Sequence, residues 1–108
     1  FKVYFEWDRS NLNAAANDTI NAAAARAKQC NVSTVRVVGY TDTSGSPKYN
    51  IGLSNRRAAV VRDALVSAGI PASLISTEGM GETNLDKPTA DGVREPLNRR
   101  TAVTISFQ

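Results

Sequence analysis

The sequence predicts an α+β domain built as a two-layer sandwich, with two main helices packed on one face of a mixed four-stranded sheet. Apolar and polar residues alternate near both ends of the chain, two internal stretches have helical periodicity, and glycine- and proline-containing turns separate the segments in a β-α-β-α-β-β order. A length of 108 residues suffices for one hydrophobic core, so we expect residues 1–108 to form a single domain. Because the chain opens directly on a strand pattern, we also expect it to be an excerpt of a longer protein.

The first half of the chain is expected to contain a strand, a helix and a second strand. Residues Lys2–Trp7 alternate between apolar and polar side chains, as in a strand with one buried face. Three polar residues that can cap a helix follow, namely Ser10, Asn11 and Asn13. Small and apolar residues then recur at helical spacing: Leu12, Ala16, Ile20, Ala23, Ala24 and Ala27. The β-branched stretch Thr34–Thr41 is typical of the second strand.

The second half begins with turn residues at positions 41–47. We predict a helix over Asn50–Ala68, where a following glycine ends it, and a short strand over Leu74–Glu78. Residues 83–98 contain two prolines and a glycine without clear periodicity, which predicts a long loop that is either functional or a tolerated insertion. Alternation over Thr101–Phe107 predicts the closing strand.

Composition narrows the classes of function. The chain has no histidine, which removes the commonest general base and the commonest metal ligand, so neither a hydrolase triad nor a zinc site nor a cofactor is expected. The single cysteine, Cys30, excludes an internal disulfide and is expected to be half-buried and unreactive. The net charge of +3 permits an anionic polymer as partner. Because the arginines are dispersed and the aromatics form no stacking series, a nucleic acid is not predicted.

Arg57 is a permanent cation in the middle of an apolar helix face. At ~100° per residue it falls among the apolar residues Leu53, Val60, Val61, Ala64 and Ala68, whereas Arg56 and Arg62 point to solvent. A buried guanidinium is expected to require an anionic partner because it does not lose its proton. Helical side chains lean towards the helix N-terminus, so Arg57 is expected to point at the loop that carries Asp42.

These two opposite charges have two interpretations. Asp42 and Arg57 could pair with each other and close the loop, which is what most such pairs do. Alternatively, they could receive the two charges of a zwitterion, since a guanidinium matches a carboxylate with two parallel hydrogen bonds. An intermediate arrangement, in which the two groups approach and then separate around a ligand, is also open.

An ordered set of short motifs resembles the C-terminal domain family of outer membrane protein A (OmpA-like), which includes peptidoglycan-associated lipoproteins and flagellar stator B proteins. The matching residues cover nearly the whole chain in order: Gly39-Tyr40-Thr41-Asp42-Thr43-Ser44-Gly45, Tyr49-Asn50, Leu53-Ser54, Arg57-Ala58, Gly79-Met80-Gly81-Glu82 and Asn98-Arg99-Arg100. Each motif is short, but their common order and spacing make the set specific. Tyr40 departs from the pattern, because the family usually has histidine there.

The resemblance implies a non-catalytic domain that binds peptidoglycan non-covalently in the periplasm of Gram-negative bacteria, through the meso-diaminopimelate of the stem peptide. Such a domain would anchor the outer membrane, or a membrane protein, to the cell wall. By the same resemblance, Asp42 would accept the ligand ammonium and Arg57 would hold its carboxylate. The remaining residues implied at the pocket are Asn50, Arg99, Ser44 and Thr41, with the loop of residues 8–11 as a weaker candidate.

Several points stay open at the level of the sequence. A cell-wall-modifying enzyme and a structural ion pair with another anionic-polymer partner are the alternative functions. The parent protein is expected to be membrane-anchored through a segment absent from these residues. For Trp7 a core position is favoured over ligand contact, and Glu82 is either a buried partner of an arginine or exposed. Since alternation sends neighbours to opposite faces, only one of Arg99 and Arg100 can point at the pocket.

Overall fold

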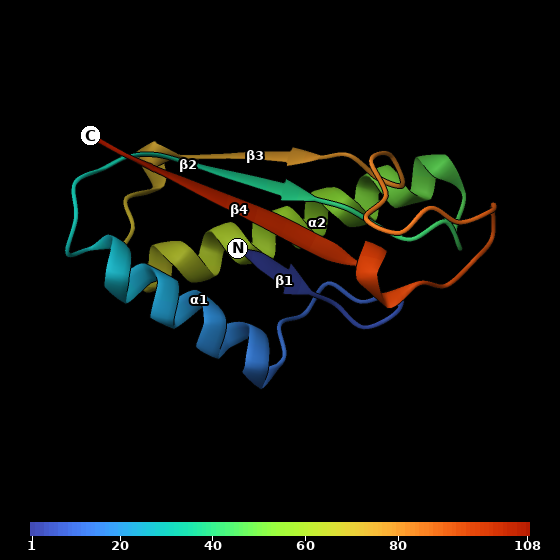
Figure 1. Ribbon diagram of the computed structural model, residues 1–108, viewed down its shortest axis with the longest axis horizontal. Helices are drawn as coiled ribbons and strands as arrows, with labels where there is room; N and C mark the ends of the chain where they lie inside the picture. Colours follow the sequence, from blue (N-terminus) through green and yellow to red (C-terminus); the bar gives the residue numbers. More distant parts are fainter.

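The computed structural model describes residues 1–108 and has the predicted α+β architecture (Figure 1). Strands β1 (Lys2–Tyr4), β2 (Val32–Gly39), β3 (Ile75–Gly79) and β4 (Arg100–Phe107) form one sheet in the order β1-β4-β2-β3. Strand β4 is antiparallel to both β1 and β2, whereas β2 and β3 are parallel, so the sheet is mixed. The last strand therefore lies between the first two, and both chain ends belong to the same layer.

Two helices, α1 (Ala14–Ala27) and α2 (Pro47–Ser67), pack on one face of this sheet (Figure 1). Asn13 caps α1, because its side chain accepts a hydrogen bond from the backbone N–H of Ala16. Helix α2 begins three residues before the predicted Asn50, since Ser46 is its N-cap and Pro47 occupies the first turn. Neither helix is long and apolar enough to cross a membrane.

The core lies between the helices and the sheet. Val35 and Val37 of β2 and Val103 and Ile105 of β4 face it at the two-residue period of a β-strand. The side chains that form the contiguous core cluster are Val3, Phe5, Ala16, Ile20, Ala24, Ala27, Val35, Val37, Ala58, Val61, Leu65, Ile70 and Val103. The predicted helical face is thus correct in outline, although Val60, Ala64 and Ala68 are only half-buried and Leu65 takes a fully buried position.

Helix α2 approaches the end of β2 very closely. A Cβ atom added to Gly39 would lie 2.0 Å from the carbonyl oxygen of Ser54, so only glycine fits at this crossing. The contact holds the N-terminal half of α2 against the loop that follows β2. It thereby places Arg57 within reach of Tyr40, whose carbonyl oxygen accepts from its Nη1.

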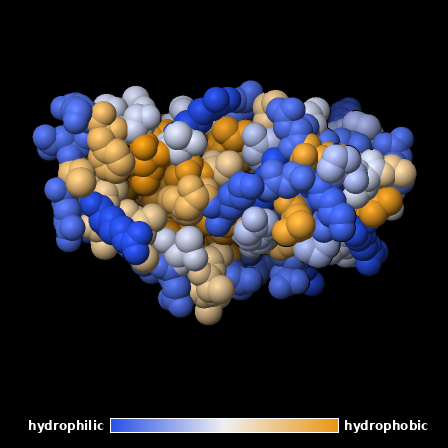
Figure 2. All heavy atoms as spheres, viewed as in Figure 1, coloured by the Kyte–Doolittle hydropathy of each residue, from blue (hydrophilic) through white to orange (hydrophobic).

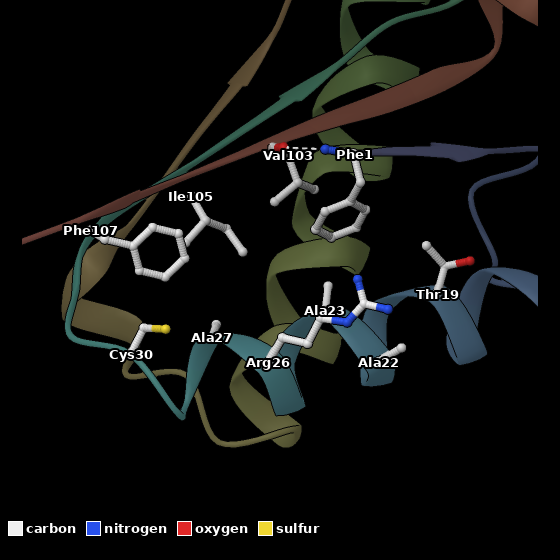
Figure 3. Close-up of a pocket in the computed structure, with 10 residues that line it drawn as sticks. All are labelled: Phe1, Thr19, Ala22, Ala23, Arg26, Ala27, Cys30, Val103, Ile105 and Phe107. Carbon is white, nitrogen blue, oxygen red and sulfur yellow. Dashed lines mark hydrogen bonds between the residues drawn. The ribbon is translucent and has the colours of Figure 1, made fainter.

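Two sequence predictions about individual side chains are wrong. Strand β1 ends at Tyr4, so the chain has left the sheet before it reaches Trp7. Trp7 is 42% exposed and is not part of the core. Cys30 follows the end of α1 and is exposed, not half-buried. It lies at the edge of an apolar groove between α1 and β4, where the side chains of Phe1, Ile105 and Phe107 converge (Figure 3).

Candidate ligand-binding site

Two concave regions differ sharply in their chemistry. The groove between α1 and β4 has a volume of about 600 Å³ and contains one charged side chain, Arg26 (Figure 3). Hydrophobic residues gather over this side of the molecule, whereas the opposite end, where the loops lie, is mostly hydrophilic (Figure 2). A smaller pocket of about 330 Å³ lies at that loop end, and it combines acidic and basic groups. We therefore take the smaller pocket as the candidate site.

Three segments build the pocket. They are the loop after β1, the loop after β2 and the first turns of α2. Their lining residues are Trp7 and Asp8, then Asp42, Ser44 and Gly45, and finally Tyr49, Asn50, Leu53 and Arg57. Of the predicted residues, Asp42, Arg57, Asn50 and Ser44 meet here.

Arg57 is fully buried, with 0% of its surface exposed. Its Nε donates to the carbonyl oxygen of Arg9 at 2.8 Å, Nη1 donates to that of Tyr40 at 3.0 Å, and Nη2 donates to that of Glu6 at 3.2 Å. The guanidinium also stacks over the Phe5 ring, 5.2 Å from its centroid. Arg57 therefore joins α2 to the loop after β1 and to the end of β2.

Burial lowers the pKa of Arg57 well below its ordinary value, to about 10, and the negative charge of Asp42 opposes that shift. The side chain is still a cation at neutral pH. Each of its two Nη atoms carries two hydrogens and donates one hydrogen bond within the protein. One N–H on each Nη therefore has no acceptor within the protein.

Asp42 is 3% exposed, and four donors surround its carboxylate. Oδ1 accepts from the backbone N–H and the hydroxyl of Ser44, at 3.1 and 2.6 Å. Oδ2 accepts from the backbone N–H of Glu95 at 3.3 Å and from Arg99 Nη1 at 3.4 Å. The contacts to Oδ1 are the tighter ones, and those to Oδ2 are at the long end of hydrogen-bond distances.

No ion pair joins Asp42 to Arg57. The salt bridge of Asp42 is with Arg99, and the hydrogen bonds of Arg57 all go to backbone carbonyls. The interpretation in which the two residues close the loop as a pair is therefore wrong. Both line one pocket while each is held by other partners, which leaves two opposite charges facing the same space.

Asn50 secures the loop between β2 and α2. Its amide nitrogen lies 3.3 Å from the carbonyl oxygen of Asp42, 3.2 Å from that of Gly45 and 3.3 Å from Glu82 Oε1. Glu82 is half-buried and bonds to this amide, not to an arginine. Asn50 therefore fixes the pocket wall as well as lining it.

Trp7, Asp8 and Tyr49 form the pocket rim, and of these the resemblance implied only Asp8, as part of the weaker candidate loop of residues 8–11. The Trp7 indole N–H donates to Ser44 Oγ at 2.9 Å, and the Tyr49 hydroxyl donates to Asp8 Oδ1. The hydrogen bond to Asp8 raises the pKa of Tyr49, which keeps the phenol protonated. Alternation along the first strand predicts a buried Trp7. The chain turns at Asp8, whose φ is 54°, and an alternating pattern does not reveal such a turn.

Two predicted residues lie outside the lining of this pocket. Arg99 approaches Asp42 from behind, with Nε donating to the carbonyl oxygen of Phe5 at 3.0 Å, and it lines a neighbouring groove. Thr41 is 1% exposed, and its hydroxyl donates to the carbonyl oxygen of Asp42 at 2.9 Å. In this structure both residues hydrogen-bond to Asp42 without lining the pocket themselves.

Arg99 and Arg100 point in different directions, as strand alternation predicted. Arg100 is buried, with its guanidinium 3.9 Å from the centroid of the Tyr40 ring. Its Nη2 donates to the carbonyl oxygen of Asn84 at 2.7 Å, and its Nε lies 3.1 Å from Asp86 Oδ2. Tyr40 thus provides an aromatic face for Arg100 instead of a titratable group for the pocket.

The geometry suits a ligand with one positive and one negative group a few bonds apart. A carboxylate and a guanidinium face one small pocket, and each is preorganised by the protein. Because both are largely shielded from water, their interactions with ligand charges are stronger than they would be at an open surface. An α-amino-acid group carries this pair of charges at the shortest separation.

Comparison with known proteins agrees with the fold and the motifs. A family model described as "OmpA family" matches residues 4–99. The chain is 38% identical to an "Outer membrane protein" of Gluconacetobacter diazotrophicus, over 97% of this chain and 29% of the relative. It is also 38% identical to "Outer membrane protein A" of Bordetella avium, over 95% of this chain and 53% of the relative. The structure of the OmpA-like domain of FopA1 from Francisella tularensis superposes with a TM-score of 0.84 at 27% identity, covering 98% of this chain and 71% of that one.

The chain therefore spans about a third to a half of the length of these two curated relatives. The names of these relatives indicate a periplasmic domain associated with the outer membrane. The family match covers most of the chain, the identities extend over nearly all of it, and the architecture is the same. The chain belongs to the OmpA family.

Proposed function

We propose that this domain binds peptidoglycan non-covalently by holding the free α-amino-acid group of meso-diaminopimelate in the stem peptide. The observation that supports this most directly is that Asp42 and Arg57 line one pocket without pairing with each other. A diaminopimelate residue whose second amino-acid end is free presents an ammonium and a carboxylate on one carbon atom. These two charges complement the two residues.

In the bound state, the ligand carboxylate would take the free N–H groups of Arg57. The three carbonyl contacts already hold the guanidinium in place, so little side-chain entropy is lost on binding. The ligand ammonium would bind the carboxylate of Asp42. It would compete there with the two long contacts to Oδ2, while the shorter bonds from Ser44 keep the carboxylate oriented.

This binding would anchor the parent protein to the cell wall. We propose that the domain is non-catalytic, and that the parent is attached to a membrane through a segment outside residues 1–108. The curated relatives are outer-membrane proteins by name, which supports an anchoring role over a cell-wall-modifying enzyme.

A titration with free meso-diaminopimelate tests the proposal. We expect saturable backbone amide shifts in residues 42–57 of the isotope-labelled protein. Pimelate has the carboxylates without the ammonium groups, and 1,5-diaminopentane has the ammonium groups without the carboxylates, so neither should reproduce the response. An equal response to pimelate, or no saturable response to diaminopimelate, would contradict the proposal.

A further inference from the structure

We propose that Arg94, stacked on Trp7 at the rim of the pocket, is a second ligand contact that binds a carboxylate of the peptide next to the diaminopimelate head group. This inference rests on the proposed function. The Arg94 guanidinium carbon lies 3.4 Å from the centroid of the Trp7 ring, and Trp7 is itself a lining residue of the pocket. Arg94 belongs to the 83–98 loop, which the sequence predicted to be either functional or a tolerated insertion.

The backbone on both sides of Arg94 is tied to the site. The N–H of Val93 donates to Thr43 Oγ1 at 3.0 Å, and the N–H of Glu95 donates to Asp42 Oδ2 at 3.3 Å. Arg94 is thus bracketed by hydrogen bonds to two adjacent residues of the loop after β2. Its position relative to the pocket is set by these contacts.

Thr43 also binds residues earlier in the 83–98 loop. Its hydroxyl donates to the carbonyl oxygen of Ala90 at 2.7 Å and lies 3.1 Å from the hydroxyl of Thr89, while its carbonyl oxygen accepts from the N–H of Gly92 at 2.8 Å. Thr43 is 4% exposed, so these bonds are shielded from water. The 83–98 loop is therefore docked onto the site.

The aromatic partner of Arg94 is equally well connected. The indole N–H of Trp7 donates to Ser44 Oγ, and that hydroxyl donates to Asp42 Oδ1 at 2.6 Å. A continuous series of contacts thus runs from Arg94 through Trp7 and Ser44 to the carboxylate that is proposed to hold the ligand ammonium.

Arg94 differs from Arg57 and Arg99 because its guanidinium has no hydrogen-bonding partner within the protein. Arg57 donates to three carbonyls and Arg99 pairs with Asp42, whereas Arg94 makes neither a salt bridge nor a side-chain hydrogen bond within the protein. Stacking on an indole holds a guanidinium by its flat face and leaves the N–H groups at its edge free. A side chain in this state is suited to a carboxylate that approaches from the pocket mouth.

The peptide that carries diaminopimelate offers two such carboxylates. One is the α-carboxylate of the neighbouring D-glutamate, and the other is the carboxylate at the peptide-linked end of diaminopimelate in a tripeptide stem. They present the same chemistry to Arg94. Amidation of one or the other distinguishes them, because an amide keeps the size of the group and removes its charge.

The test measures the affinity of the tripeptide L-Ala-γ-D-Glu-meso-diaminopimelate and of its two singly amidated forms, for the wild type and for Arg94→Gln. We expect the wild type to lose about three- to tenfold in affinity when the contacting carboxylate is amidated, as for a partly exposed charge-assisted contact. Arg94→Gln should bind the unamidated tripeptide more weakly than the wild type does, by the same factor. Amidation should then cause no further loss of affinity for this variant. Arg62→Gln, which removes the same charge from the distant half of α2, should behave like the wild type.

The outcomes separate this inference from the function on which it rests. If Arg94→Gln still prefers the unamidated tripeptide over both amidated forms as strongly as the wild type does, the second contact is wrong while the diaminopimelate site stands. If the wild type binds no form of the tripeptide, both proposals are wrong. A parallel loss for Arg62→Gln would indicate a net-charge effect and would also overturn the inference.

Discussion

Asp42 forms its salt bridge with Arg99, at 3.4 Å, and not with Arg57, the arginine whose charge faces the same pocket. Arg57 is instead bound by the carbonyls of Glu6, Arg9 and Tyr40. This division gives Arg57 two roles, because it holds the loop after β1 in place and presents a cation to the pocket. The two roles have separate experimental consequences.

Replacing Arg57 is expected to destabilise the fold. Arg57→Ala removes the donors of three carbonyls and leaves a void beneath them, so we predict a loss of about 3 kcal/mol in the free energy of unfolding. Urea denaturation followed by circular dichroism measures it. Arg62→Ala, at an exposed position on the same helix, should change the stability by no more than about 0.5 kcal/mol. Equal effects of the two substitutions would show that the carbonyl contacts contribute little.

Asp42→Asn separates ligand binding from stability more cleanly. The amide has nearly the same shape as the carboxylate but lacks the charge that an ammonium requires, so retention on purified sacculi should fall more than about tenfold. Co-sedimentation measures the retained fraction. Asp63→Asn, which alters an exposed acid paired only with Arg62, is the matched control. Undiminished retention of a folded Asp42→Asn protein would contradict the assigned site.

Two glycines should respond to alanine in opposite directions. At Gly39 the new Cβ would lie 2.0 Å from a backbone oxygen of α2, so Gly39→Ala should cost about 3 kcal/mol or more of stability. At Gly52, within α2, the nearest atom is 3.5 Å away on the flexible side chain of Arg56. Gly52→Ala should therefore stabilise the domain by about 0.5–1 kcal/mol through helix propensity. Thermal unfolding of both variants provides the comparison, and a stable Gly39→Ala would refute the close crossing of α2 and β2.

Ligand binding is predicted to be insensitive to pH between about pH 6 and about pH 8.5. The chain contains no histidine, the group that ordinarily titrates in this range. The pKa of Arg57, lowered to about 10, still lies above it, so the guanidinium keeps its charge and loses it only as the pH rises through that value. Isothermal titration with a stem tripeptide in matched buffers measures the profile. An inflection near neutral pH would point to a titrating group that this pocket does not contain.

Tyr40→His should introduce a pH dependence of stability. The imidazole would lie beside the guanidinium of Arg100, which disfavours its protonated form and places its pKa in the folded state below the unfolded value. The unfolded chain then binds more protons, so stability should rise with pH through about 6.5 and be lower below it. Wild-type unfolding measured over the same pH range is the control. A flat profile for the variant would mean that Arg100 does not approach residue 40 in solution.

Much of the architecture follows from local patterns in the chain. Alternation over the first and last strands, helical spacing in two stretches, and the turn residues at positions 41–47 predict the order of the elements and the face that each one buries. The direction of helical side chains also predicts that Arg57 reaches the segment around Asp42, because it depends only on helix geometry. Local geometry of this kind needs no knowledge of distant contacts.

The partners of the charged groups could not be predicted in the same way. Arg99 and Glu95 reach Asp42 across more than fifty residues of chain, and the 83–98 loop docks on Thr43 over a similar separation. Such contacts depend on β4 lying between β1 and β2, which no periodic pattern specifies. Trp7 lies at the pocket rim and not in the core, because β1 ends three residues earlier than the alternation predicts. Periodicity predicts which side of a helix or strand is buried. Which charged residues meet at the pocket depends on how segments distant in the sequence pack together.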